Sequence, residues 1–235
     1  MNNKKMLGQP GFCIVPDFER PARDAIEKLG RFAVSLIGDG LGRRAIMDSA
    51  LRPVNPARRM CGPAFTVETR GADNLMLHAA LALAKPGDVI VCDAHGDLSA
   101  AVWGGLMGAS AVKLGLAGLV VDGAVRDRDE LYAMDLPVFA RGINPTGPHK
   151  DGPGQINLPI SCGGVPVHPG DVIVGDGDGV IVVPKADLAL ATEAAAQRDA
   201  GEAKRRVEIE RGEINQPWLE AALRAKGVLK AGEGL

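Results

Sequence analysis

The sequence lacks several features that mark whole classes of proteins. Aromatic residues make up only 3% of its 235 residues, so it offers little stacking surface for single-stranded nucleic acid. The net charge is -2 and no block of lysine and arginine occurs, which gives a basic nucleic-acid-binding face little support. No run approaches the roughly 18 apolar residues of a membrane-spanning helix. We therefore expect neither a nucleic acid nor a membrane as a partner.

Paired cysteines and common catalytic signatures are also missing. The four cysteines, Cys13, Cys61, Cys92 and Cys162, are scattered without CxxC spacing, which favours reduced, buried thiols over disulfides or a zinc site. The first fifteen residues contain no apolar stretch long enough for a signal peptide, so we expect a cytoplasmic protein. No dinucleotide fingerprint, P-loop, GxSxG or HExxH motif occurs, so no motif supports a nucleotide-binding or hydrolase function.

The order of predicted elements indicates an α/β fold. Apolar periodicity and turn residues predict helices at 21–30, 73–88, 98–115, 126–134, 186–213 and 218–227, and strands at 31–40, 65–69, 88–97, 116–123 and 137–142. Residues 143–184 are rich in glycine and proline between short apolar runs and predict further strands. We expect one α/β domain over residues 1–185, with parallel strand pairs, and a helical arm over residues 186–235.

The segment WGGLMG places two glycines, Gly104 and Gly105, where a helix is expected to begin. Without Cβ atoms, a ligand can approach the backbone closely, and the free N–H groups of a helix N-terminus attract a carboxylate or phosphate. Close packing between helices explains such glycines equally well.

An arginine and an aspartate, Arg126 and Asp127, follow the buried strand predicted at 116–123. The planar guanidinium suits a carboxylate or an enolate oxygen, and one carboxylate suits Mg²⁺, which keeps several waters. Ligands settle at this end of the strands in open α/β sheets. The alternative is a solvated ion pair that opens a helix.

Other polar residues have weaker support. His95 and Asp97 end the strand predicted at 88–97 and either face the same cleft or cap local structure. Asp176 and Asp178 in GDGDG suggest calcium, but the rest of the EF-hand pattern is absent, so a hairpin turn is the better interpretation. Lys113 is a candidate Schiff-base lysine with nothing specific in its favour.

Taken together and in order, three segments carry a family resemblance. GGLMGASAVKLGLAGLVVDGAVRDRDEL, PVFARGINPTG and PGDVIVGDGDGVIVVP resemble the RraA-like family, and within it the divalent-metal-dependent 4-hydroxy-4-methyl-2-oxoglutarate/4-carboxy-4-hydroxy-2-oxoadipate aldolases. The resemblance extends from about Ala25 to the C-terminal helix. It implies a swivelling β/β/α domain with a C-terminal helical arm, assembled as a homotrimer or homohexamer with its site between subunits.

The resemblance also implies roles for individual residues. The backbone amides of Gly104, Gly105, Leu106 and Met107 would hold the carboxylate of a 2-oxo acid substrate. Arg126 would contact the keto acid, and Asp127 would bind a divalent cation, Mg²⁺ or Mn²⁺.

One residue departs from the pattern of some of these aldolases, which carry an aspartate at the position of Gly105. A catalytic glutamate from the arm of a neighbouring subunit matches Glu202 here, with Glu193 and Asp199 as alternatives. The arm is expected to pack on that neighbouring subunit.

The activity implied is cleavage of a 4-hydroxy-2-oxo acid to pyruvate and a second keto acid, with oxaloacetate decarboxylation as a side activity. Two alternatives stay open: an oxaloacetate decarboxylase with little aldolase activity, and a non-catalytic regulator that binds a ribonuclease. Such regulators are shorter and lack the arm, so the arm from Ala186 onward, together with Arg126 and Asp127, favours the enzyme.

Overall fold

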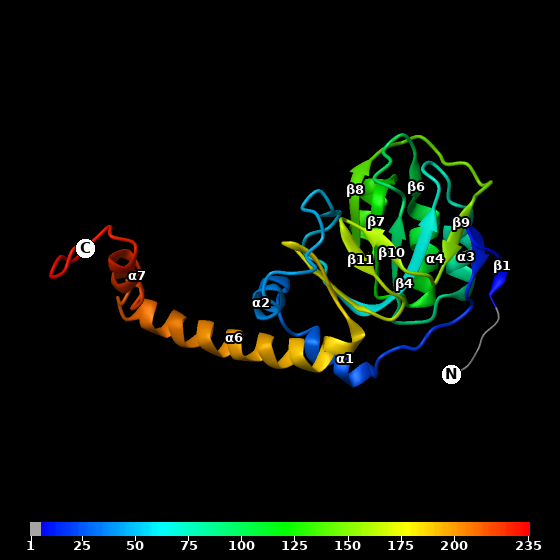
Figure 1. Ribbon diagram of the computed structural model, residues 1–235. Coiled ribbons are helices and arrows are strands. Elements are labelled where there is room, and N and C mark those ends of the chain that lie inside the picture. The colour runs from blue at the N-terminus through cyan, green and yellow to red at the C-terminus, as the bar shows by residue number, and fades with distance from the viewer. Residues whose placement is uncertain (1–5) are drawn as a thin grey trace. The chain divides into compact units, whose positions relative to one another are not determined.

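The structure is a computed structural model that describes residues 6–235 (Figure 1). Within these residues, eleven strands form one hydrogen-bonded sheet. They are β1 (Leu7–Gln9), β2 (Phe12–Ile14), β3 (Arg52–Pro53), β4 (Met60–Thr69), β5 (Val89–Asp93), β6 (Ala101–Trp103), β7 (Gly118–Val125), β8 (Val138–Ile143), β9 (Gly154–Ile156), β12 (Val172–Asp176) and β13 (Gly179–Val183). A separate hairpin joins β10 (Ile160–Cys162) to β11 (Val165–Val167).

Helices occur between the strands and after them in the chain. They are α1 (Arg23–Leu29), α2 (Val34–Gly40), α3 (Leu75–Leu83), α4 (Gly105–Leu114), α5 (Arg128–Ala133), α6 (Leu188–Glu210) and α7 (Leu219–Ala225), with a short 3-10 turn at Lys185–Asp187. The chain divides into two compact units, Met1–Ala196 and Gln197–Leu235, and the boundary falls within α6.

Four parallel strands, in the order β4, β5, β7 and β8, form the centre of the sheet. Every residue of β5 and β7 is buried. Continuous apolar runs of this kind form strands that are covered on both faces. The apolar runs of β5 and β7 therefore predict buried strands from the sequence. Since α4 and α5 begin beyond the carboxyl ends of β6 and β7, the residues that follow these two strands are brought to one edge of the sheet.

Three apolar clusters separate the layers of the first unit. On one face of the central strands, α3 and α4 pack against the largest cluster. On the other face, the hairpin of β10 and β11 packs against the second cluster (Figure 1). A third cluster joins β12 and β13 to α1, α2 and the first residues of α6. A helical layer and two β layers confirm the β/β/α fold with a C-terminal helix that the sequence predicts.

Most of the predicted elements are present, but two of the predictions are wrong. Residues 31–40 were expected to form a strand, but Val34–Gly40 is the helix α2. A short apolar run does not separate a strand from a buried helix. The helical conformation of this segment is instead favoured by a residue distant in sequence. The carboxylate of Asp176, which is buried at the β12–β13 turn, accepts a hydrogen bond of 2.8 Å from the backbone N–H of Val34.

The second error lies at 98–115, where one interrupted helix was expected. Ala101–Trp103 instead forms β6, which pairs in parallel with β7, and α4 begins only at Gly105. The paired residues Ala101 and Trp103 are buried, so strand pairing and burial override the helical periodicity.

Two smaller predictions are confirmed, and one further contact orders the start of α3. GDGDG forms the tight turn of the antiparallel hairpin β12–β13, in which Asp176 pairs with Gly179. The four cysteines are free thiols. Asp73 caps the start of α3, where its Oδ1 accepts a hydrogen bond of 2.9 Å from the N–H of Leu75.

The second unit is mainly helical and polar. The last part of α6 is tied to the following loop by Arg205, which pairs with Glu208 at 2.9 Å and donates to the carbonyl oxygens of Ile214 and Asn215. Arg224 of α7 pairs with Glu220 at 2.9 Å. In residues 6–235, no helix combines the length and apolar character needed to cross a lipid bilayer.

Candidate active site

Arg126 and Asp127 lie where β7 leads into α5. The N–H of Arg126 donates a hydrogen bond of 2.9 Å to the carbonyl oxygen of Trp103, which fixes the end of β7 against β6. Asp127 has a left-handed backbone with φ of 57°, and its carbonyl oxygen accepts the N–H of Leu131 as α5 begins. A left-handed conformation is rare outside glycine, although aspartate and asparagine tolerate it, and such positions concentrate at functional sites.

The Asp127 carboxylate lies at the N-terminus of α4. Its Oδ2 accepts a hydrogen bond of 2.9 Å from the N–H of Gly105, and the same oxygen lies 3.5 Å from Nε of Arg126. A side chain at Gly104 would place its Cβ 2.6 Å from this oxygen and 3.0 Å from Cγ of Arg126. Glycine at 104 is therefore what allows the Arg126–Asp127 pair to approach the start of the helix.

These residues surround one cavity with a volume of about 200 Å³. Five of the residues singled out in the sequence line it: Gly104, Leu106, Met107, Arg126 and Asp127. Arg126 and Asp127 keep 42% and 41% of their side-chain surface exposed, so both remain accessible to a ligand. The structure thus brings the predicted residues together, while the role of each remains a prediction.

Four further polar or aromatic residues of the cavity were not identified from the sequence: Asn74, His78, Trp103 and Lys150. Two of them carry buried polar atoms without a hydrogen-bond partner in the described residues, namely Oδ1 of Asn74 and Nε1 of Trp103. Asn74 is 5% exposed and Trp103 1%. Burying an unpaired polar group is costly, so both of these lining residues carry a polar atom whose hydrogen bond the described residues do not supply.

His78 and Lys150 add the basic groups of this wall. Burial, and then the charge of Lys150, lower the pKa of His78 below its ordinary value of 6.5. The ring is therefore uncharged at neutral pH, and Lys150 and Arg126 carry the positive charge of the cavity. A single histidine in an apolar helix and an isolated lysine in a loop gave no signal in the sequence, because only the fold brings them together.

Gly105 does not line the cavity, and the space beside it is filled. A Cβ at this position would collide with the carboxylate of Glu130 from α5. The side chain of Glu130 therefore occupies the space that a side chain at position 105 would need.

The remaining candidates lie outside the cavity lining. The ring of His95 lies 3.5 Å from Asp93 and 3.6 Å from Glu68. Asp97 accepts hydrogen bonds from the N–H and hydroxyl of Ser99. Lys113 is in the last turn of α4 and is likewise not part of the lining. Glu202 belongs to the second unit, where it pairs with Arg206 on the same helix at 2.8 Å, and its predicted role at a neighbouring subunit's site stays a prediction.

The donor set at Asp127 fits a hard divalent cation. Among the described residues, neighbouring groups engage Oδ2 of its carboxylate and not Oδ1, which is therefore open to a ligand. Within residues 6–235 no three His, Cys, Asp or Glu side chains converge as a metal-binding group, which does not suit a structural zinc site. Mg²⁺ is bound through one or two carboxylates and completes its shell with water and substrate, so a single aspartate beside a cavity suits it.

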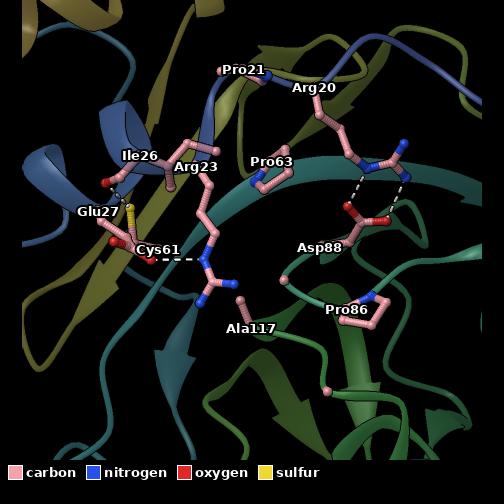
Figure 2. Close-up of a pocket in the computed structure, with 12 residues that line it drawn as sticks. Arg20, Pro21, Arg23, Ile26, Glu27, Cys61, Pro63, Pro86, Asp88 and Ala117 are labelled. Atoms are coloured by element: carbon pink, nitrogen blue, oxygen red, sulfur yellow. Dashed lines mark hydrogen bonds and ion pairs between the residues drawn. The ribbon is translucent and has the colours of Figure 1, made fainter.

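A larger cavity of about 410 Å³ lies between α1 and the loops that precede β5 and β7 (Figure 2). Its two arginines are already paired. Arg20 forms two hydrogen bonds of 2.7 Å with the buried carboxylate of Asp88, and Arg23 lies 2.8 Å from Glu27. This cavity is at the amino ends of the strands, whereas ligands of open α/β sheets bind beyond the carboxyl ends. The smaller cavity at Arg126 is therefore the better candidate for the active site.

Comparison with known proteins agrees with this fold. A family model described as RraA-like (Aldolase/RraA) matches residues 34–182, which include α4, Arg126 and Asp127. The chain belongs to the RraA-like family.

Among curated relatives of this RraA-like protein, one from Halalkalibacterium halodurans is 45% identical over 162 residues, which are 69% of this chain and 77% of the relative. One from Burkholderia mallei is 38% identical over 141 residues, which are 60% of this chain and 85% of the relative. Both are provisionally named 4-hydroxy-4-methyl-2-oxoglutarate aldolase.

Among solved structures, a Streptomyces coelicolor protein described as an unusual member of the RNase ES inhibitor RraA family has a TM-score of 0.73 and 28% identity. The match covers 81% of this chain and 99% of that one.

Proposed function

We propose that this RraA-like protein is a metal-dependent carbon–carbon lyase. Its substrate would be 4-hydroxy-4-methyl-2-oxoglutarate or 4-carboxy-4-hydroxy-2-oxoadipate, which it cleaves to pyruvate and a second keto acid. The observation that carries the proposal is the meeting of Arg126, Asp127 and the N-terminus of α4 on one cavity that also contains unmatched buried polar atoms. The names of the curated relatives support the same class of reaction.

Binding of the substrate follows from the groups that line the cavity. The first turn of α4 presents backbone N–H groups at Leu106 and Met107, and its partial positive charge favours the carboxylate of a 2-oxo acid. Asp127 would hold Mg²⁺ or Mn²⁺, which when bound supplies Lewis acidity at the keto group. Arg126 presents its guanidinium to the keto oxygen.

In the reaction, the 4-hydroxyl group loses its proton and becomes a carbonyl, the C3–C4 bond breaks, and its electron pair passes to the enolate of pyruvate. Protonation at C3 then gives pyruvate. Negative charge grows on the keto oxygen during this step, and Arg126 stabilises it there. Glu202 of a neighbouring subunit is the proposed acidic group for proton transfer. Decarboxylation of oxaloacetate passes through the same enolate and is the expected side activity.

The test is pyruvate release from 4-hydroxy-4-methyl-2-oxoglutarate and from oxaloacetate, measured with Mg²⁺ and with EDTA. We expect turnover that EDTA removes and that Asp127→Ala abolishes, because this substitution deletes the proposed metal ligand. Arg126→Ala should lower the rate roughly 10²–10³-fold, as the loss of an oxyanion donor does.

Asp129→Ala is the matched control, since Asp129 is an exposed carboxylate on α5 outside the cavity lining. It should retain wild-type turnover. No pyruvate from either substrate under any metal condition would reject the lyase and leave a binding or regulatory role. Pyruvate from oxaloacetate alone would identify a decarboxylase.

A further inference from the structure

Two carboxylates approach the first residue of α4. The Oδ2 atom of Asp127 accepts the backbone N–H of Gly105 at 2.9 Å. A Cβ built on Gly105 would lie 2.7 Å from Oε1 of Glu130 and closer still to its Cδ and Oε2. The carboxylate of Asp127 therefore lies at the amide of Gly105, and the carboxylate of Glu130 lies beside the α carbon of the same residue.

The position of Glu130 is fixed by the packing of α5 on α4. Leu131, the next residue of the chain, is 1% exposed and belongs to the largest apolar cluster. A Cβ at Gly108 would lie 2.8 Å from Cδ2 of Leu131 and 2.8 Å from Sδ of Met134, so glycine at this position allows the two helices to pack closely. The N–H of Leu131 also donates to the carbonyl oxygen of Asp127 at 3.0 Å. These contacts hold Glu130 next to the first turn of α4.

The carboxylate of Glu130 has no counter-ion in the described part of the chain. Glu130 is exposed, and among residues 6–235 no hydrogen bond or ion pair engages its side chain. An acidic residue in the first turn of α5 favours the dipole of that helix, and Asp129 in the same turn serves this purpose equally. The dipole of α5 does not account for a second carboxylate that lies against α4, close to the group that binds Asp127.

The charges at the start of α4 are not balanced. Asp127 and Glu130 bring two negative charges, whereas Arg126, whose Nε lies 3.5 Å from Oδ2 of Asp127, brings one positive charge. The N-terminus of a helix adds about half of an elementary charge. Carboxylates held near one another repel unless a positive charge lies close to both. A divalent cation at Asp127 supplies that charge, and Mg²⁺ suits the place because it keeps several waters beside one or two carboxylates.

We propose that Glu130 is a positioning residue for the divalent cation at Asp127 and acts on it through the water shell of the cation. This inference rests on the proposed function, which places Mg²⁺ or Mn²⁺ at Asp127. Glu130 is not among the residues that line the cavity, so we assign it no contact with the substrate. Groups that hold the ligands and waters of a metal ion contribute strongly to the affinity for the metal.

The experiment measures binding of Mn²⁺ to the full chain without substrate, from the electron paramagnetic resonance signal of free Mn²⁺. Glu130→Gln removes the charge and keeps the size of the side chain. We expect the Kd for Mn²⁺ to rise about 10- to 100-fold, the range for loss of a group behind the metal ligands. The Mg²⁺ concentration that gives half-maximal pyruvate release should rise by the same factor.

Asp129→Asn is the matched control, because it removes the same charge from the same turn of α5. It should bind Mn²⁺ as the wild type does, which separates the position of the Glu130 carboxylate from a general effect of net charge. Circular dichroism and thermal unfolding verify that each variant is folded.

A second pair of variants moves the carboxylate from α5 to α4. Glu130→Ala empties the space beside Gly105 and should weaken Mn²⁺ binding as Glu130→Gln does. Adding Gly105→Asp to Glu130→Ala returns a carboxylate to that space, and it should recover part of the lost affinity. No recovery would contradict the role of a carboxylate at this place.

The outcomes separate this inference from the proposed function. Wild-type affinity in Glu130→Gln, or an equal loss in Asp129→Asn, would overturn the role of Glu130 while Asp127→Ala still abolishes binding. If the wild type binds no Mn²⁺, or if Asp127→Ala binds it unchanged, the cation site of the proposed function itself fails.

Discussion

Part of the candidate site is held in place by the carboxylate of Asp73, which is not among the residues that line the cavity. Its two oxygens accept hydrogen bonds from the backbone of Leu75, Asp151 and Gly152, and so join the start of α3 to the loop of Lys150. Burial raises the pKa of Asp73, but these three hydrogen bonds outweigh it, so the pKa lies below the ordinary value of 3.8. The ionised carboxylate is therefore part of the folded structure.

We predict that Asp73→Asn lowers the free energy of unfolding at pH 7 by about 1–3 kcal/mol, because an amide leaves part of this set of buried donors unsatisfied. A carboxyl group whose pKa is depressed by folding stabilises the protein above its unfolded pKa. That contribution is lost as the pH falls through the folded pKa. The difference between variant and wild type in urea titrations should thus be constant above about pH 5 and shrink below 3.8. A difference that grows on acidification would contradict this.

At the residue scale, the sequence predicted the groups that are adjacent in the chain and missed those that the fold assembles. Arg126 and Asp127 follow a buried strand and stand side by side, so both their edge of the sheet and their chemistry could be inferred. Asn74 and Lys150 are far apart in the chain and are brought together by the hydrogen bonds that Asp73 and Asn74 make with the loop of Lys150. No local pattern carries that information.

At the scale of elements, long periodic segments were predicted well and short ones were not. The helix α6 is long enough for its composition to identify it, and the β-branched residues of β5 and β7 favour strands. The helix α2 has seven residues, and its capping by Asp176 comes from a distant hairpin. Its conformation is therefore a property of tertiary packing rather than of its own residues.

Helix α6 contains one residue that weakens it without evident structural benefit. Gly201 lies in its interior, and a Cβ at this position would meet no atom within 4 Å. We predict that Gly201→Ala stabilises α6 by about 0.5–1 kcal/mol, because alanine loses less backbone entropy in a helix. Amide hydrogen exchange in α6 should slow.

The reciprocal change, Ala200→Gly, is the control for this effect at the neighbouring exposed position of the same helix. Its amide exchange should be faster than in the wild type. Equal protection in both variants would show that α6 is stabilised by contacts that override helix propensity.

At the scale of the whole molecule, the second unit exposes several large apolar side chains. Ile214 is 71% exposed, Trp218 61% and Val228 64%. Large apolar side chains that stay exposed are available for contacts with another protein surface. They support the proposal that the arm packs on a neighbouring copy of this chain.

We therefore predict a trimer or hexamer in solution. Replacing two of these residues together, as Ile214→Asp with Trp218→Ser, should shift the protein to smaller species, because the interface loses its apolar contacts. Light scattering after size-exclusion chromatography measures the mass of each species, and circular dichroism verifies that the arm stays helical. A monomeric wild type would refute the assembly and, with it, the place proposed for Glu202.

The left-handed backbone at Asp127 has a consequence for how such a protein changes over time. Only a few side chains accept φ of 57°, and asparagine is one of them. An Asp127→Asn change therefore keeps the start of α5 and removes the negative charge on which the proposed chemistry depends. A single nucleotide separates the two codons. If the proposed function is right, the scaffold can thus lose its activity in one mutational step and keep its fold.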